Sequence, residues 1–146
     1  MNGIRIAMWS GPRNLSTAMM RSFENRHDTV VADEPFYAHY LYKTEIDHPG
    51  KEEIIASQST DWAEVADMCT GEIPDSKPIW YQKQMAQHNL EGCDLSWIKG
   101  VTNCFALLVN IVLICVPFFL SNLISSKLLY AEIPPHIIKS IFLFIK

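Results

Sequence analysis

The stretch MWSGPRNLSTAMM, residues 8–20, combines the end of an apolar segment, a polar loop and the start of a Met-rich segment. Before it, IRIAMW (residues 4–9) alternates apolar side chains, which is typical of a short strand. After it, STAMMRSFENR is rich in helix formers, and Ser16 or Thr17 could cap the start of a helix. A strand, a tight loop and a helix in this order point backbone N–H groups and the positive helix end to one place. The sequence therefore predicts an anion-binding loop.

Length and charge limit the possible functions. The chain has 146 residues, about one domain, and a formal net charge of −4. No general basic field is present, so we expect no nucleic-acid partner, and anion binding must come from a focused site. The four cysteines form no C-x-x-C pair and no metal-ligand spacing, which indicates free thiols and no metal site. The first residues lack the apolar core of a secretory signal.

The next segments alternate in the way of an α/β protein. A second strand is expected at 29–32 and a third within 77–85, with helices at 37–44, 51–57 and 59–71. Ser59 or Thr60 is a plausible cap for the last of these helices, and Gly71 a plausible stop. Strands that alternate with helices predict a parallel sheet, whose ligands gather at the carboxyl ends of the strands.

Three polar clusters follow the three predicted strands: SGPRN at 10–14, DEP at 33–35 and QKQ at 82–84. Because the carboxyl ends of parallel strands meet at one edge of the sheet, we expect the three clusters to share one rim.

The last part of the chain differs in composition. From Cys104 to Ile124 there is no charged residue, a length sufficient to cross a bilayer as a helix. A second interpretation is a buried parallel strand, CFALLV (104–109), followed by another apolar segment. A third is a tail foreign to the fold, so we divide the chain into a domain at 1–105 and a divergent, apolar helical tail at 106–146.

The loop lacks the common nucleotide-binding patterns. Walker A needs G-x-x-x-x-G-K-[ST], whereas this loop has one Gly and no Lys, and G-x-G-x-x-G is absent as well. An ordinary kinase or ATPase is therefore not expected. Arg13 could bind two oxygens of a phosphate or sulfate, with donors from Ser16 and Thr17. The alternative is a capped helix beside a solvated arginine.

The residues SGPRNLSTAMMRSFENR resemble the 5'-phosphosulfate loop of P-loop sulfotransferases. The resemblance is closer still to the bacterial-type sulfotransferase-like branch, which in plants is also fused to branched-chain aminotransferase-like domains. It rests on six blocks that occur in order between Ile4 and Phe105: MWSGPRNLSTAMMRSF, DEPFYAHYL, HPG, DW, YQKQMAQH, and a Trp followed by TNCF. The family's fold is a three-layer, P-loop NTPase-like α/β fold with a parallel sheet, here incomplete.

The resemblance implies a donor, 3'-phosphoadenosine 5'-phosphosulfate, whose sulfuryl group passes to a hydroxyl or amine of an unidentified small-molecule acceptor. No metal is implied, and the family is cytoplasmic, although residues 104–124 leave membrane association open. The positions that match the donor-binding loop are Ser10, Gly11, Pro12, Arg13, Asn14, Leu15, Ser16 and Thr17.

Four residues are candidates for catalysis. Glu34 is the first choice as general base, because some sulfotransferase branches place a Glu after the second strand, while its neighbour Asp33 is expected in a turn or cap. His39 and His88 are rivals, since histidine titrates near neutral pH. Lys83 could supply a second cation near the leaving group. The alternatives are a loop ion pair for Glu34, structural roles for the histidines and a solvated Lys83.

The resemblance ends after TNCF. The family continues with an Arg-Asp-Pro type motif that holds the 3'-phosphate of the donor, whereas this chain has no Arg beyond position 26. We therefore expect a truncated product whose transferase activity is reduced or lost. Two alternatives stay open: a non-catalytic, membrane-associated fragment, and a generic phosphate- or nucleotide-binding module.

Overall fold

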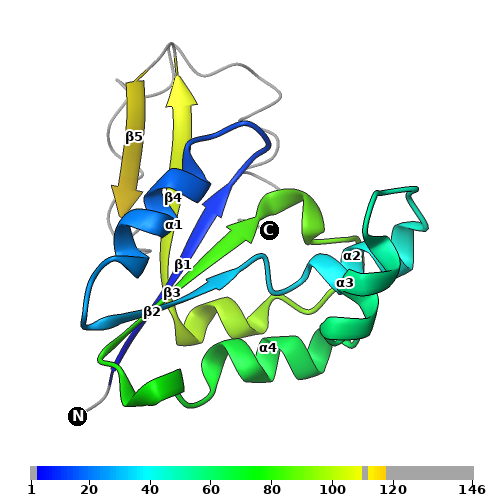
Figure 1. Cartoon of the computed structure of the whole chain (residues 1–146), viewed down its shortest axis with the longest axis horizontal. Helices are drawn as coiled ribbons and strands as arrows, with labels where there is room; N and C mark the ends of the chain where they lie inside the picture. Colours follow the sequence, from blue (N-terminus) through cyan, green and yellow to red (C-terminus); the bar gives the residue numbers. More distant parts are fainter. Residues whose placement is uncertain (1–2, 110–111, 118–146) are drawn as a thin grey trace.

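The computed structural model of the chain describes residues 3–109 and 112–117 and contains one five-stranded sheet (Figure 1). The strand order is β2-β3-β1-β4-β5, in which the first four strands are parallel and β5 runs antiparallel to β4. The strands are β1 (Ile4–Ser10), β2 (Thr29–Asp33), β3 (Ile79–Met85), β4 (Thr102–Val109) and β5 (Val112–Pro117).

Four α-helices and three short 3-10 turns connect the strands. They are α1 (Ser16–Glu24), α2 (Tyr37–Thr44), α3 (Lys51–Ser57), α4 (Trp62–Thr70), η1 (Pro74–Ser76), η2 (Ala86–His88) and η3 (Ser96–Gly100). The predicted strands and helices of the first 85 residues are confirmed, as is the parallel sheet.

Side chains on the two faces of β1 enter two separate cores. Ala7 and Trp9 pack with Val65 and Cys69 of α4 and with Trp97, whereas Met8 packs on the opposite face in a cluster with Met20 of α1 and Tyr81. Successive strand residues point to opposite faces, so the central strand is apolar on both. Helices therefore cover both faces of the sheet, α1 on one and α4 on the other.

The predicted cap of α4 is wrong. The carboxylate of Asp61 caps this helix and accepts hydrogen bonds from the backbone N–H groups of Ala63 at 2.8 Å and Glu64 at 3.0 Å. The hydroxyl of Ser59 instead accepts from the Asp61 N–H at 3.1 Å. Asp is as good a cap as Ser, and here it stands immediately before the first helical residue. Gly71 ends the helix as expected.

The membrane-spanning helix predicted at 104–124 is not supported. Residues 104–109 lie in β4 and residues 112–117 form β5, and no helix in the described residues is long and apolar enough to cross a membrane. The alternative of a buried parallel strand is confirmed, since Met8 of β1 pairs in register with Cys104 and Ala106 is fully buried. Residues 110–111 and 118–146, including the rest of the predicted helical tail, lie outside the described residues.

The boundary expected after residue 105 falls inside β4. This strand pairs with β1 over the five positions from Ile6↔Thr102 to Ser10↔Ala106 and is continuous through Phe105. The division into two parts stays a prediction.

Candidate functional site

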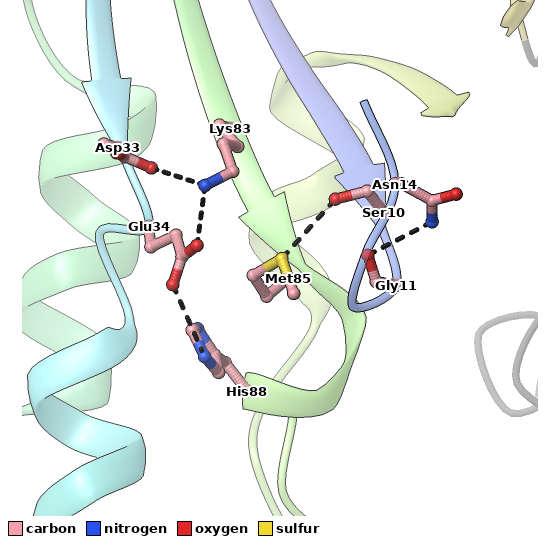
Figure 2. A network of polar contacts seen from close by, with 8 residues as sticks. All are labelled: Ser10, Gly11, Asn14, Asp33, Glu34, Lys83, Met85 and His88. Atoms are coloured by element: carbon pink, nitrogen blue, oxygen red, sulfur yellow. Dashed lines mark hydrogen bonds and ion pairs between the residues drawn. The ribbon is translucent and has the colours of Figure 1, made fainter. Parts of the chain in front are cut away.

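The loop between β1 and α1 is a compact turn at the carboxyl end of the central strand. The Asn14 amide donates a hydrogen bond to the carbonyl of Gly11 at 3.1 Å, and Arg13 has a left-handed backbone with φ of 60°. The hydroxyl of Ser10 contacts Met85 Sδ at 3.5 Å, which ties the loop to the end of β3 (Figure 2). A non-glycine residue at positive φ costs free energy, so contacts within the turn must hold Arg13 in this shape.

Helix α1 begins without a side-chain cap. Its N-cap residue is Leu15, whose side chain has no oxygen to accept a hydrogen bond, and the first helical backbone bond joins the Met19 N–H to the Leu15 carbonyl at 3.0 Å. The expectation that Ser16 or Thr17 caps the helix is therefore wrong. The N–H groups in the first turn of any helix have no carbonyl partner within the helix, and in α1 no capping side chain accepts from them either. This helix end has the donors and the positive dipole that an anion requires.

The loop also carries one exposed cation. Arg13 is exposed and forms no hydrogen bond or ion pair with the described part of the chain, whereas the neighbouring Ser16 is buried. A guanidinium that is not engaged elsewhere can bind an oxyanion through two oxygens.

Lys83 is a buried cation held between two carboxylates. Its side chain is 6% exposed, and Nζ lies 2.9 Å from Asp33 Oδ1 and 2.7 Å from Glu34 Oε1 (Figure 2). Asp33 and Lys83 pair in register at the ends of β2 and β3, which brings the groups together. Burial alone would lower the pKa of Lys83, but the hydrogen bonds and charges of the two carboxylates outweigh it and raise the pKa. The alternative of a solvated lysine is wrong, and Lys83 is a charged, oriented donor.

Glu34 occupies a strained turn beside this lysine. Its φ is 50°, its N–H donates to the Lys83 carbonyl at 3.0 Å, and its own carbonyl accepts from the Tyr37 N–H at 2.9 Å. These two backbone bonds hold the turn, and the side chain remains 22% exposed. The carboxylate is therefore fixed by Lys83 and still reachable from solvent.

His88, from η2, faces the other oxygen of Glu34. Its Nε2 lies 3.8 Å from Glu34 Oε2. Its ring stacks on Tyr37 with 5.0 Å between centroids and contacts Tyr40, which is tilted, at 4.8 Å. Burial, and to a smaller extent the charge of Lys83, lowers the pKa of His88 to about 4. A neutral imidazole at this distance forms no hydrogen bond with the carboxylate.

His39 lies in different surroundings. Its Nδ1 donates to the Thr60 carbonyl at 2.8 Å, its Nε2 is 3.8 Å from Cys93 Sγ, and its ring meets Trp62 edge-on. The structure brings Glu34 and Lys83 together but places His39 in this separate group. A catalytic role for His39 stays a prediction without a contact to the other two residues.

The sequence reasoning missed two features of the site. Asp33 was expected in a turn or cap, yet it is an ion-pair partner of Lys83. His88 was expected either as a base or in a structural role, and its position opposite Glu34 Oε2 was not predicted. The signal for the first was present, since an Asp-Glu pair and a lysine end two predicted strands. Among the described residues no group of three His, Cys, Asp or Glu side chains could hold a metal ion.

Two comparisons with known proteins give matches to this chain. A family model described as a sulfotransferase domain matches residues 4–116. Two proteins of Arabidopsis thaliana, branched-chain-amino-acid aminotransferase-like proteins 2 and 1, are each 39% identical to this chain over 88 residues, which is 60% of the chain. The chain spans only 15% and 16% of the length of these two relatives. No solved structure gives a significant match.

Proposed function

The chain belongs to the sulfotransferase domain family, and on that premise we propose that it binds 3'-phosphoadenosine 5'-phosphosulfate and transfers its sulfuryl group to a small molecule. The acceptor offers a hydroxyl or an amine. The observation that carries this proposal is the uncapped start of α1, which lies at the carboxyl end of β1 beside the Lys83–Glu34 pair.

The loop residues suit the 5'-phosphosulfate end of the donor. The first-turn N–H groups of α1 and the guanidinium of Arg13 would bind its oxygens, with the Thr17 hydroxyl as a further donor. Sulfuryl transfer builds negative charge on the phosphate oxygen that leaves. Fixed N–H donors and a cation stabilise that charge without reorganising, which is the largest contribution to many such reactions.

Glu34 suits the role of general base. The acceptor oxygen or nitrogen attacks the sulfur, the bond from sulfur to the phosphate oxygen breaks, and the acceptor's proton goes to the Glu34 carboxylate. Lys83 fixes this carboxylate through Oε1 and leaves Oε2 unpaired by a cation. The arrangement gives the base a defined orientation at the rim of the sheet.

Binding of the donor's second phosphate is expected to be weak. The family resemblance implies an arginine for this phosphate beyond Phe105, whereas the last arginine of this chain is Arg26. Loss of one charge-assisted contact of about 1.5–3 kcal/mol weakens binding by roughly 10- to 100-fold. Transfer by this chain should accordingly be slow or undetectable at low donor concentration.

A binding titration with 3'-phosphoadenosine 5'-phosphate tests the proposal, together with transfer of labelled sulfate from the donor to a panel of hydroxyl and amine acceptors. We expect saturable binding that is tighter than that of inorganic phosphate and of adenosine 5'-phosphate. Equal, weak binding of all three would instead indicate a generic phosphate-binding module. No binding to any of them would exclude both functions.

A further inference from the structure

His39 and Cys93 form a pair that the proposed transfer does not use. His39 lies on α2 and Cys93 in the loop between η2 and η3, and Nε2 of the ring is 3.8 Å from Sγ. Hydrogen bonds of sulfur are longer than those of oxygen because the sulfur atom is larger, so this separation suits a thiol that donates to a ring nitrogen. The fold therefore brings a nucleophilic side chain within reach of a base.

The second contact of the His39 ring locates its proton. Nδ1 lies 2.8 Å from the carbonyl oxygen of Thr60, and a carbonyl oxygen can only accept a hydrogen bond. Nδ1 therefore carries the proton, and in the neutral ring Nε2 keeps the lone pair that faces Cys93. In the contact between the two side chains, the S–H group of Cys93 is the donor and Nε2 is the acceptor.

Neighbouring contacts hold both members of the pair in place. The His39 residue is 5% exposed, and its ring meets Trp62 edge-on with 5.4 Å between centroids. The indole N–H of Trp62 also donates to the carbonyl of Asp94, the residue after Cys93, at 2.8 Å. The N–H of Cys93 itself donates to the Leu90 carbonyl at 3.2 Å. Thiol and ring are therefore oriented toward each other before any reagent arrives.

Cys93 is the partly exposed member of the pair, so a reagent can reach its sulfur from solvent. Burial raises the pKa of the Cys93 thiol above its usual value. At neutral pH the side chain is therefore a thiol and not a thiolate, and it needs a base to become a nucleophile. Cys69 differs, because it is fully buried and burial raises its pKa to about 12.

We propose that Cys93 is a modification site for low-molecular-weight disulfides of the glutathione class, with His39 as the base that takes its proton. Sγ of Cys93 attacks one sulfur of the disulfide while the thiol proton passes to Nε2 of His39. A bond forms between Sγ and that sulfur, the disulfide bond breaks, and the proton moves from Nε2 to the thiolate that leaves. Cys93 is oxidised to a mixed disulfide and one sulfur of the reagent is reduced to a thiol, so the step needs no other reactant. The inference is independent of the proposed sulfuryl transfer.

Reaction of the full chain with oxidised glutathione at neutral pH tests the proposal, with mass spectrometry of peptides to locate the modified cysteine. We expect Cys93 to be modified before Cys104, which is also partly exposed but lies in β4 between two paired strands. The buried Cys69 should not react in the folded chain. Modification of Cys104 or Cys69 as fast as that of Cys93 overturns the inference.

The substitution His39→Gln isolates the base. The glutamine amide can still donate to the Thr60 carbonyl but cannot take a proton, so we expect the rate constant at Cys93 to fall at least tenfold. His27→Gln is the matched control, because His27 is exposed in the turn between α1 and β2, and it should leave the rate constant unchanged. In urea the wild type and both variants should react at Cys93 at one rate. Equal rates at Cys93 in folded wild type and folded His39→Gln overturn the inference.

A second measurement needs neither a reaction nor a variant of His39. ¹⁵N NMR of the His39 ring in the full chain should show the proton on Nδ1 and the lone pair on Nε2 at neutral pH. In Cys93→Ala the S–H donor is lost, so the Nε2 resonance should move toward that of a nitrogen without a hydrogen bond. A proton on Nε2, or an unchanged resonance in Cys93→Ala, overturns the inference even where His39→Gln fails to fold.

Discussion

The ammonium of Lys83 lies 2.7 Å from Glu34 Oε1, although 49 positions separate the two residues in the chain. Both residues come at the carboxyl ends of neighbouring parallel strands, and the backbone N–H of Glu34 also donates to the Lys83 carbonyl. The loop between β1 and α1 follows β1, and β1 lies on the side of β3 opposite to β2. The loop predicted to bind an anion and the carboxylate–ammonium pair are therefore neighbours on one rim.

Replacing Arg13 should weaken binding of the donor product. We expect Arg13→Ala to raise the Kd for 3'-phosphoadenosine 5'-phosphate by about 10- to 100-fold, the value of one charge-assisted contact. Arg26→Ala is the matched control, because Arg26 is exposed and paired with Asp28 away from the loop. Calorimetry measures both variants. Equal effects of the two substitutions would show that the loop does not bind the ligand.

Replacing Glu34 should reduce transfer and spare binding. Glu34→Gln keeps the shape of the side chain but removes the base, so we expect the transfer rate to fall by roughly 10²- to 10⁴-fold. Asp33→Asn is the control, since Asp33 contacts the same lysine through a side chain that is 47% exposed. We expect less than a tenfold loss there. A Glu34→Gln variant that transfers at the wild-type rate contradicts the assignment of the base.

Removing Lys83 should destabilise the fold in a pH-dependent manner. Lys83→Met leaves two carboxylates side by side without their cation, and we expect the free energy of unfolding to fall by about 1–3 kcal/mol at pH 7, since Asp33 is largely solvated. The pKa of Lys83 in the fold is raised above its usual 10.5. The stabilisation is therefore complete below pH 10.5 and is lost as the pH rises through the folded pKa.

Urea unfolding at pH 7 and above pH 11 measures this difference between the wild type and Lys83→Met. Exposed Lys99 provides the control, because Lys99→Met should change the stability by less than about 0.5 kcal/mol. A difference between wild type and Lys83→Met that grows at high pH would contradict the ion-pair explanation.

His88 should make the protein acid-sensitive. Its pKa falls from 6.5 to about 4 on folding, so its neutral form contributes stability above pH 6.5 that is lost as the pH falls toward 4. The shift in pKa corresponds to about 3 kcal/mol in the free energy of unfolding. Unfolding experiments at pH 7 and pH 4 should show a smaller acid loss in His88→Phe than in the wild type. The same acid loss in both would mean that other groups dominate.

The cap of α4 gives a test remote from the site. Asp61→Ala removes the acceptor of two backbone N–H groups and should cost about 1 kcal/mol of stability. In Thr60→Ala the hydroxyl that is lost makes no hydrogen bond with the described residues, and the carbonyl that binds His39 remains. We expect a change below about 0.5 kcal/mol there. The reverse order of the two effects would restore Thr60 as the cap.

The sequence by itself determined β1, α1 and the edge of the sheet where the polar clusters gather. Local patterns are sufficient to predict β1 and α1. Apolar residues alternate in residues 4–9, helix formers follow Thr17, and a Gly-Pro loop lies between them; the structure has β1 and α1 at these places. Three polar clusters after three predicted strands were also sufficient to predict a shared rim, because parallel strands present their carboxyl ends on one edge.

Only the tertiary structure decided what the apolar segment is and which polar groups pair. Residues 104–109 contain no charge, and a bilayer and the interior of a doubly covered sheet select the same apolar side chains, so composition cannot distinguish them. The pairing of Lys83 with Asp33 and Glu34 depends on strand register, and the contacts of the His88 ring with two tyrosines depend on the path of α2. These are long-range relations, and local sequence periodicity carries no information about them.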